Sequence, residues 1–142
     1  EFFLGYRKTK LNNNQFIKSI IIPIENRRII KSYKISKRID DDISSVCGAF
    51  NLKIKNNIIS SILIAFGGMS VIPKRAINCE KFLTNNEFSK NSIINAQQIL
   101  EKDFSPIDDM RASSRYRMEI AKNLLLKLYL EIKNKQNIRI NE

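Results

Sequence analysis

The chain has 142 residues, of which 43% are hydrophobic and 27% are charged, and its formal net charge is +11. This length suits one globular domain with a buried core, and the composition is that of a globular protein. Histidine is absent and lysines interrupt every apolar stretch, which excludes imidazole chemistry and the roughly 18-residue apolar helix that spans a membrane.

The first half of the chain predicts β-strands, because short β-branched or alternating runs follow one another. The runs occupy residues 17–22, which Pro23 ends, and then 28–36, 43–55 and 58–66. Asn56 and Asn57 tolerate left-handed conformations and predict a tight hairpin turn between the last two strands. Alternation within residues 28–36 sets Lys34 on the face opposite Tyr33 and Ile35. Together these features predict an antiparallel meander.

The second half predicts three helices, because apolar residues recur there at helical spacing. Pro73 suits a first helical position for the first helix, and Ser89 or Asn91 suits the N-cap of the second, over residues 90–102. Ser113 or Ser114 caps the third, and Lys133 and Lys135 suit its C-terminal end. The expected fold is therefore α+β, with an antiparallel sheet of three to four strands followed by three helices packed on one face.

The basic charge does not by itself predict a nucleic-acid partner. The chain contains 25 Ile, 16 Asn and 16 Lys, three residue types that share A/T-rich codons, and its lysines are scattered along the sequence. A free-standing basic interaction module that binds nucleic acid is the alternative interpretation. Cys47 and Cys79 are far apart and form no C-x-x-C pair, so we expect no metal or iron–sulfur site within the chain.

Three segments are unusual enough to be candidates for function. Three adjacent aspartates at residues 40–42 cannot all face one ion on an extended chain, so a solvated loop is the better reading. Gly67 and Gly68 allow a close backbone approach but lack the spacing of a phosphate-binding loop. Residues 108–117 combine acids and serines near a helix start with Arg115 and Arg117, whose direction the sequence leaves open.

These segments carry a resemblance to a known family. The pieces are F-F-x-G-Y-R-K-T at residues 2–9, Y-K-I-S-K-R-I-D-D-D-I at 33–43, A-F-G-G-M at 65–69 with P-K-R-A at 73–76, and D-M-R-A-S-S-x-Y-R at 109–117. In this order, they resemble the C-terminal domain of the FAD-binding subunit of xanthine dehydrogenase, a member of the molybdenum hydroxylase flavoproteins. The match extends from residue 1 to about residue 133.

The resemblance implies a function for the chain and roles for two of its residues. Lys34 matches the family lysine that contacts the flavin of FAD, and Ile17 matches an apolar residue that lines the same pocket. In the family, electrons from hypoxanthine or xanthine oxidation at a molybdenum cofactor pass through two [2Fe-2S] clusters to FAD, which reduces NAD. The chain itself is expected to hold no catalytic residue and no metal.

The resemblance also implies what other chains or domains must supply. Residues 1–16 correspond to the end of the FAD-binding domain and a connecting segment, 17–133 to the C-terminal domain, and 134–142 to a polar tail. The expected partners are an upstream FAD-binding domain, an iron–sulfur domain and a molybdenum-binding subunit. We expect a cytoplasmic fragment that is not competent alone; a degenerate remnant without partners is a further alternative.

Overall fold

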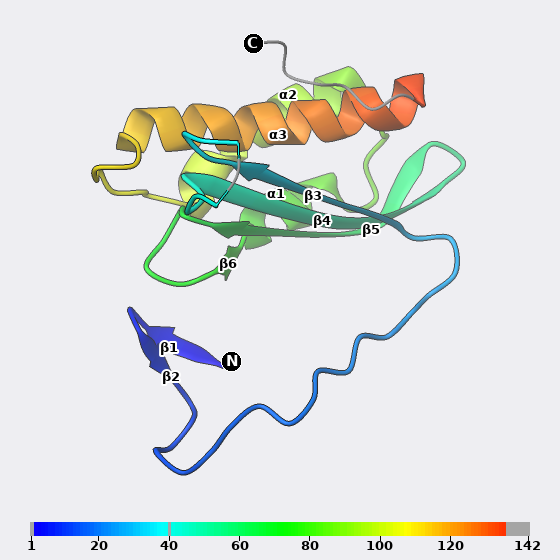
Figure 1. The fold of residues 1–142 in the computed structure, drawn as a ribbon. Helices are drawn as coiled ribbons and strands as arrows, with labels where there is room; N and C mark the ends of the chain where they lie inside the picture. The colour runs from blue at the N-terminus through cyan, green and yellow to red at the C-terminus, as the bar shows by residue number, and fades with distance from the viewer. Residues whose placement is uncertain (1, 40, 136–142) are drawn as a thin grey trace.

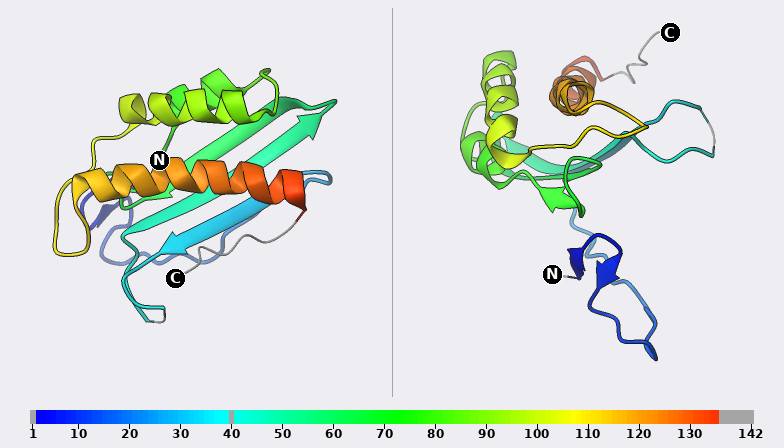
Figure 2. Two further views of the ribbon diagram at one scale, coloured as in Figure 1. Left: turned by 90° about the horizontal axis from the view of Figure 1, so that it is seen from above. Right: turned by 90° about the vertical axis from the view of Figure 1, so that its left-hand side faces the viewer.

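The computed structural model describes residues 2–39 and 41–135. Its centre is a four-stranded antiparallel sheet, and three helices lie on one face of that sheet (Figures 1 and 2). The strands are β3 (Ile29–Ile35), β4 (Val46–Lys55), β5 (Ile58–Gly67) and β6 (Lys74–Arg75), in that order across the sheet. The helices are α1 (Ile77–Leu83), α2 (Lys90–Asp103) and α3 (Ser114–Asn134). The predicted α+β fold is confirmed.

Alternation along the strands builds the core between the sheet and the helices. Phe50, Leu52, Ile64 and Phe66 are fully buried and point to the helical side, as a half-buried sheet requires. The ring of Phe66 meets those of Phe50 and of Phe104 edge-on, with centroids 5.7 Å and 5.5 Å apart. Helix α3 packs on β4 and α1 packs on β5, while α2 packs on both helices.

The predicted turns and helix caps are largely confirmed. Asn56 and Asn57 both have positive φ, of 50° and 61°, and join β4 to β5 in a tight hairpin. The Ser89 hydroxyl accepts a hydrogen bond from the backbone N–H of Ser92 at the start of α2. Ser113 caps α3 in the same way, by accepting from the N–H of Tyr116.

The expected start of the first helix at Pro73 is wrong. The residues after Pro73 form the short edge strand β6, which pairs with the end of β5. Helix α1 begins only at Ile77, where the Asp103 carboxylate accepts hydrogen bonds of 2.9 Å from the backbone N–H groups of Asn78 and Cys79. This anchor comes from the end of α2, and local sequence periodicity does not reveal it.

The strand predicted at residues 17–22 is also wrong. These residues lie in an extended connector without secondary structure, between a small N-terminal hairpin and β3. The hairpin consists of β1 (Phe3–Gly5) and β2 (Lys8–Thr9). Ile21, in the middle of the predicted strand, is 91% exposed. High β-propensity is insufficient here, because a strand needs a neighbouring strand to complete its hydrogen bonds.

Two further expectations concern the aspartates at residues 40–42 and the polar tail. Asp42 accepts hydrogen bonds from the backbone N–H groups of Arg38 and Ile43, which agrees with the predicted solvated loop, whereas Asp40 lies outside the described residues. Most of the predicted polar tail, residues 136–142, also lies outside them. No helix in the described part of the chain is both long and apolar enough to cross a membrane.

Candidate functional site

The sheet has a face that no helix of the described part of the chain covers, and small side chains line the end of it that contains Lys34. Cross-strand register sets Lys34 of β3 beside Cys47 of β4, and Cys47 beside Gly67 of β5. In the next row of this face, Ser32 of β3 lies beside Ala49 of β4, and Ala49 beside Ala65 of β5. We call this surface the open face and define it by Ser32, Lys34, Cys47, Ala49, Ala65 and Gly67. Such small side chains leave the backbone of the strands accessible to a group that approaches from this side.

Lys34 lies on the open face, as the alternation predicts. Its neighbours Tyr33 and Ile35 are partly buried against the core, whereas Lys34 is exposed. Among the residues that the structure describes, its ammonium has no recorded hydrogen bond or ion pair. An unpaired cation beside small side chains is available to an anionic or polar ligand.

Tyr33 fixes the inward side of β3 and therefore the outward direction of Lys34. Its hydroxyl donates a 2.8 Å hydrogen bond to the carboxylate of Glu131, near the end of α3. Burial and this carboxylate raise the pKa of Tyr33 above its ordinary value. The ammonium of Lys127 also lies 5.1 Å from the centre of the Tyr33 ring. Strand β3 is thus tied to α3 immediately beside Lys34.

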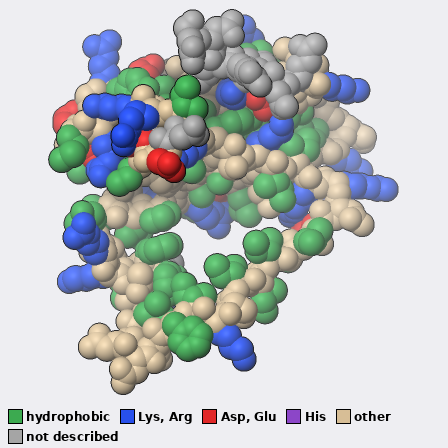
Figure 3. Space-filling model, viewed as in Figure 1, with side chains coloured by type: hydrophobic (Ala, Val, Ile, Leu, Met, Phe, Trp, Pro, Cys, Tyr) green, Lys and Arg blue, Asp and Glu red, His purple; other side chains and the backbone are tan. Residues whose placement is uncertain are grey.

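Ile17 lies in the connector and is 52% exposed. The connector passes on the side of the sheet away from the helices (Figure 1), and the space-filling view shows a gap between it and the body of the protein (Figure 3). The structure therefore does not bring Ile17 and Lys34 together into one enclosed site. The connector also exposes other large apolar side chains, namely Phe16, Ile20, Ile21, Ile22 and Ile24.

Arg28 anchors the end of this connector at the edge of the open face. Its guanidinium donates to the side chains of Asn51 and Ser61, at 3.2 Å and 3.3 Å, and to Glu25 at 2.7 Å. Asn51 and Ser61 lie on β4 and β5, on the same side of the sheet as Cys47. The connector thus enters the sheet from the side of the open face.

A buried arginine joins the other sequence motifs at the opposite end of the strands. Arg117, in the first turn of α3, is 3% exposed. Its guanidinium donates to the carbonyl oxygen of Ser45, to that of Gly68 at 2.8 Å, and to the Asp109 carboxylate at 2.6 Å. We call these four residues the Arg117 cluster. It connects the loop after Lys34, the glycine pair and the segment before α3.

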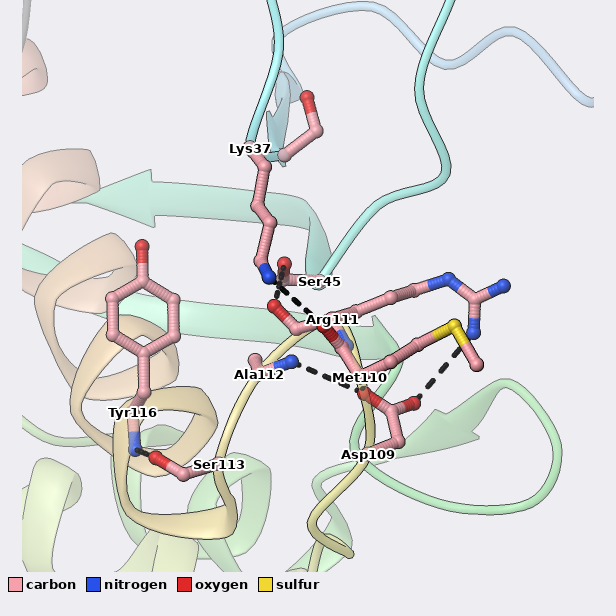
Figure 4. Close-up of a pocket in the computed structure, with 9 residues that line it drawn as sticks. Lys37, Ser45, Asp109, Met110, Arg111, Ala112, Ser113 and Tyr116 are labelled. Atoms are coloured by element: carbon pink, nitrogen blue, oxygen red, sulfur yellow. Dashed lines mark hydrogen bonds and ion pairs between the residues drawn. The ribbon is translucent and has the colours of Figure 1, made fainter.

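Asp109 organises the turn before α3. Its carboxylate accepts from the backbone N–H groups of Arg111 and Ala112 as well as from Arg117. These hydrogen bonds, foremost that from Arg111, hold the pKa of the Asp109 carboxyl below its ordinary value. A pocket of about 500 Å³ lies beside this turn (Figure 4). Across it, the Lys37 ammonium donates a 2.8 Å hydrogen bond to the carbonyl oxygen of Met110.

The sequence identified the motif containing Arg117 but not the direction of its side chain. The apolar repeat that predicts α3 passes through Tyr116, which is exposed, whereas its neighbour Arg117 is buried. Two of the partners of Arg117, Ser45 and Gly68, lie 72 and 49 residues away in the chain. The sequence feature that could have revealed these contacts is the joint occurrence of the three motifs in one chain, because such motifs can meet in space.

Comparison with protein families agrees with this geometry. A sequence model of the CO dehydrogenase flavoprotein C-terminal domain matches residues 31–132, which is most of the chain. The chain belongs to this family. The matched segment begins within β3 and ends within α3, so it contains the open face, Lys34 and the Arg117 cluster. The resemblance to the molybdenum hydroxylase flavoproteins is thereby confirmed.

Individual relatives of the flavoprotein C-terminal domain include large and small proteins. Xanthine dehydrogenase of Emericella nidulans is 32% identical over 137 residues, which are 93% of this chain but 10% of that protein. The glyceraldehyde dehydrogenase medium chain of Sulfolobus acidocaldarius is 29% identical over 93% of this chain and 47% of that protein. The chain therefore spans about a tenth of the curated xanthine dehydrogenases and about half of that medium chain.

Solved structures share the fold of the domain. Quinoline 2-oxidoreductase of Pseudomonas putida 86 superposes with a TM-score of 0.81 over 96% of this chain and 47% of its own, at 20% identity. A reconstituted CO dehydrogenase of Oligotropha carboxidovorans gives a TM-score of 0.80 over 92% of this chain and 45% of its own, at 21% identity. These similarities concern the fold alone.

Proposed function

We propose that this C-terminal domain forms one wall of a flavin site in a xanthine dehydrogenase-type molybdenum hydroxylase, with Lys34 facing the flavin of FAD. The observation that carries the proposal is the exposed ammonium of Lys34, which has no partner among the described residues, beside a row of small side chains. We further propose that Ile17 lines the same site once the connector is packed against a partner.

The chemistry of the open face fits a flavin ring but not a whole FAD. A planar ring can lie against the small side chains of Ala49 and Ala65, and a fixed cation can contact its polar edge. The chain has no glycine-rich phosphate-binding loop, so the pyrophosphate requires another domain. We therefore propose a shared site, with the FAD-binding domain on the side of the exposed connector.

FAD, when bound, supplies the electron and hydride transfer, and the residues of this chain act on its surroundings. The Lys34 ammonium supplies a positive charge that stabilises negative charge developing on reduction. Tyr33 and Ile35, held in the core, orient β3 so that this charge points outward. An apolar side chain at Ile17 would exclude water from the site.

For the whole protein, we propose the reaction sequence that the resemblance implies. Hypoxanthine or xanthine is oxidised at a molybdenum cofactor, and electrons pass through [2Fe-2S] clusters to FAD and then to NAD. In this proposal residues 1–16 end the FAD-binding domain, residues 17–133 form the C-terminal domain, and the iron–sulfur and molybdenum parts are separate domains or chains. The complex acts in the cytoplasm, and the C-terminal domain alone is not competent.

The first test replaces the cation that faces the flavin. The chain is co-produced with the FAD-binding half of the flavoprotein. Flavin content and the rate at which added NADH, as the electron donor, reduces the bound flavin are measured for Lys34→Met. Lys53→Met is the matched control, because Lys53 is another exposed lysine on the same side of the sheet, at the other end of β4. We expect Lys34→Met to lower both quantities and Lys53→Met to leave them unchanged. Unchanged values for Lys34→Met would refute its role.

A second test uses the chemistry of the open face directly. Cys47 lies on this face and is partly exposed, whereas Cys79 is buried. Alkylation with iodoacetamide therefore reports whether the row containing Lys34 is covered. We expect FAD together with the FAD-binding half to protect Cys47, and the chain without them to be alkylated at that residue. Equal alkylation in both states would contradict a flavin on this face.

A further inference from the structure

The Arg117 cluster lies directly beyond the row of the open face that contains Lys34. This row joins Lys34, Cys47 and Gly67 across three strands. Ser45 precedes β4 and Gly68 follows β5, so the two carbonyl oxygens that Arg117 holds flank the ends of these strands. One guanidinium therefore sets the separation of the strand ends next to Lys34.

We propose that Arg117 is a positioning residue for Lys34, acting from the opposite face of the sheet. The inference rests on the proposed function of Lys34 at the flavin. The connection passes through the backbone, because Ser45 also donates a 2.8 Å hydrogen bond from its N–H to the carbonyl oxygen of Ile35. Ile35 is the residue after Lys34, so a shift of Ser45 is passed to β3 beside that lysine.

The geometry leaves little freedom for this connection. Gly68 has φ of +81°, and a Cβ there would lie 2.3 Å from the Ser45 carbonyl oxygen, so the two backbones are in close contact. Arg117 is in turn held by Asp109, which the backbone N–H groups of Arg111 and Ala112 fix. A closely packed and hydrogen-bonded junction transmits small displacements instead of absorbing them.

A guanidinium is required because three acceptors in different directions must be satisfied at once. Its planar fork presents several N–H groups in fixed directions, whereas a lysine ammonium presents a compact charge on a flexible stem. Replacement by lysine keeps the charge but loses the simultaneous contacts to Ser45 and Gly68. The strand ends can then move, and a displacement of about 1 Å at a reacting centre costs on the order of 100-fold in rate.

The test compares Arg117→Lys with two controls in the chain co-produced with the FAD-binding half. Arg115→Lys makes the same chemical change at an exposed residue of the same helical turn. Leu128→Ala removes a buried core side chain farther along α3 and matches a general loss of stability. Flavin dissociation constant and flavin reduction potential are measured at a temperature where thermal melts show every variant folded.

We expect Arg117→Lys to weaken flavin binding by about 10-fold, the lower end of the loss seen when a residue that orients a metal ligand is replaced, and to shift the flavin potential. Neither control should do so. A change no larger than that of Leu128→Ala would overturn the proposal, because Arg117 would then serve only the fold.

A double variant separates this inference from the proposed function. If Arg117 acts through Lys34, the Arg117→Lys, Lys34→Met double variant should bind flavin no more weakly than Lys34→Met alone. If the two substitutions instead weaken flavin binding independently, so that their fold-changes multiply in the double variant, the positioning role is overturned. The flavin role of Lys34 then remains intact. The proposed function itself is tested by Lys34→Met alone, with Arg117 unchanged. If that variant changes neither flavin binding nor flavin potential, the proposed function fails.

Discussion

The two faces of the central sheet come from the same strands but differ in nearly every physical property. On the helical face, β4 and β5 bury large apolar side chains such as Phe50 and Phe66. On the open face the same strands present Cys47, Ala49 and Ala65, and β3 presents an exposed lysine. One face builds the core, and no helix of the described part of the chain covers the other.

The treatment of charge differs between the faces in the same way. The charged side chains buried on the helical side have partners: Glu80 accepts from the backbone N–H of Ile64, and Asp103 accepts from those at the start of α1. Burial of a charge without such partners would be costly. Lys34 lies in no such environment. In the proposed function, this exposed cation faces the flavin instead of a partner within the chain.

The largest expected effect tests the division between the faces directly. Phe50→Ala removes a fully buried ring and should lower the free energy of unfolding by about 3–5 kcal/mol. Leu63→Ala removes a side chain on the other side of β5 that is 42% exposed and should cost less than about 1 kcal/mol. Urea unfolding measures both. Similar losses would mean that the side of the sheet away from the helices, which carries Leu63, is packed in the isolated chain.

A somewhat smaller effect is expected where the two faces meet, at the glycine pair. Gly68→Ala combines a positive φ with a Cβ that would clash with the Ser45 carbonyl, and should destabilise the protein by about 2–3 kcal/mol. Gly67→Ala is the matched control, because a Cβ there meets only the Cys47 side chain at 3.8 Å. Thermal melts of the two variants compare them. Equal melting temperatures would contradict the close approach of Gly68 to the Ser45 carbonyl oxygen.

The open face was largely predictable from the sequence, because it depends on local alternation. The period of two places Lys34 opposite Tyr33 and Ile35 whatever the rest of the fold does. The Asn56–Asn57 turn fixes the pairing of β4 and β5 only next to itself, because the register shifts between Lys53 and Ile54. The strand at residues 17–22 failed for the complementary reason. Its β-branched residues have the propensity, but strand formation needs a neighbour that only tertiary structure provides.

The Arg117 cluster could not be predicted in the same way. Tyr116 and Arg117 are adjacent on a helix, and the apolar repeat favours burial of the tyrosine. The arginine is buried instead because two backbone carbonyl oxygens from distant parts of the chain and the nearby Asp109 carboxylate accept its hydrogen bonds. Likewise, α1 starts at Ile77 because of Asp103, not because of Pro73. Long-range hydrogen bonds decide both cases.

A smaller effect on the free energy of unfolding is expected from the titration of Asp109, which tests the electrostatics of the Arg117 cluster. Its pKa is lowered in the folded protein, so it contributes stability that is present above its unfolded pKa of about 4 and is lost as the pH falls through the lower folded pKa. Asp109→Asn should therefore be less stable than the native chain at pH 7, and the difference should narrow toward pH 3. Urea unfolding at both pH values measures this; a constant difference would contradict the assignment.

The smallest expected effect is on stability at Lys34, and it separates a residue of the fold from a residue of a site. Lys34→Met should change the free energy of unfolding by no more than about 0.5 kcal/mol, as for surface substitutions. The adjacent Tyr33→Phe should cost about 1 kcal/mol, because it removes the hydrogen bond to Glu131. Urea unfolding compares the two neighbours. If Lys34→Met costs as much as Tyr33→Phe, the lysine serves the fold and the main reason to assign it to a ligand disappears.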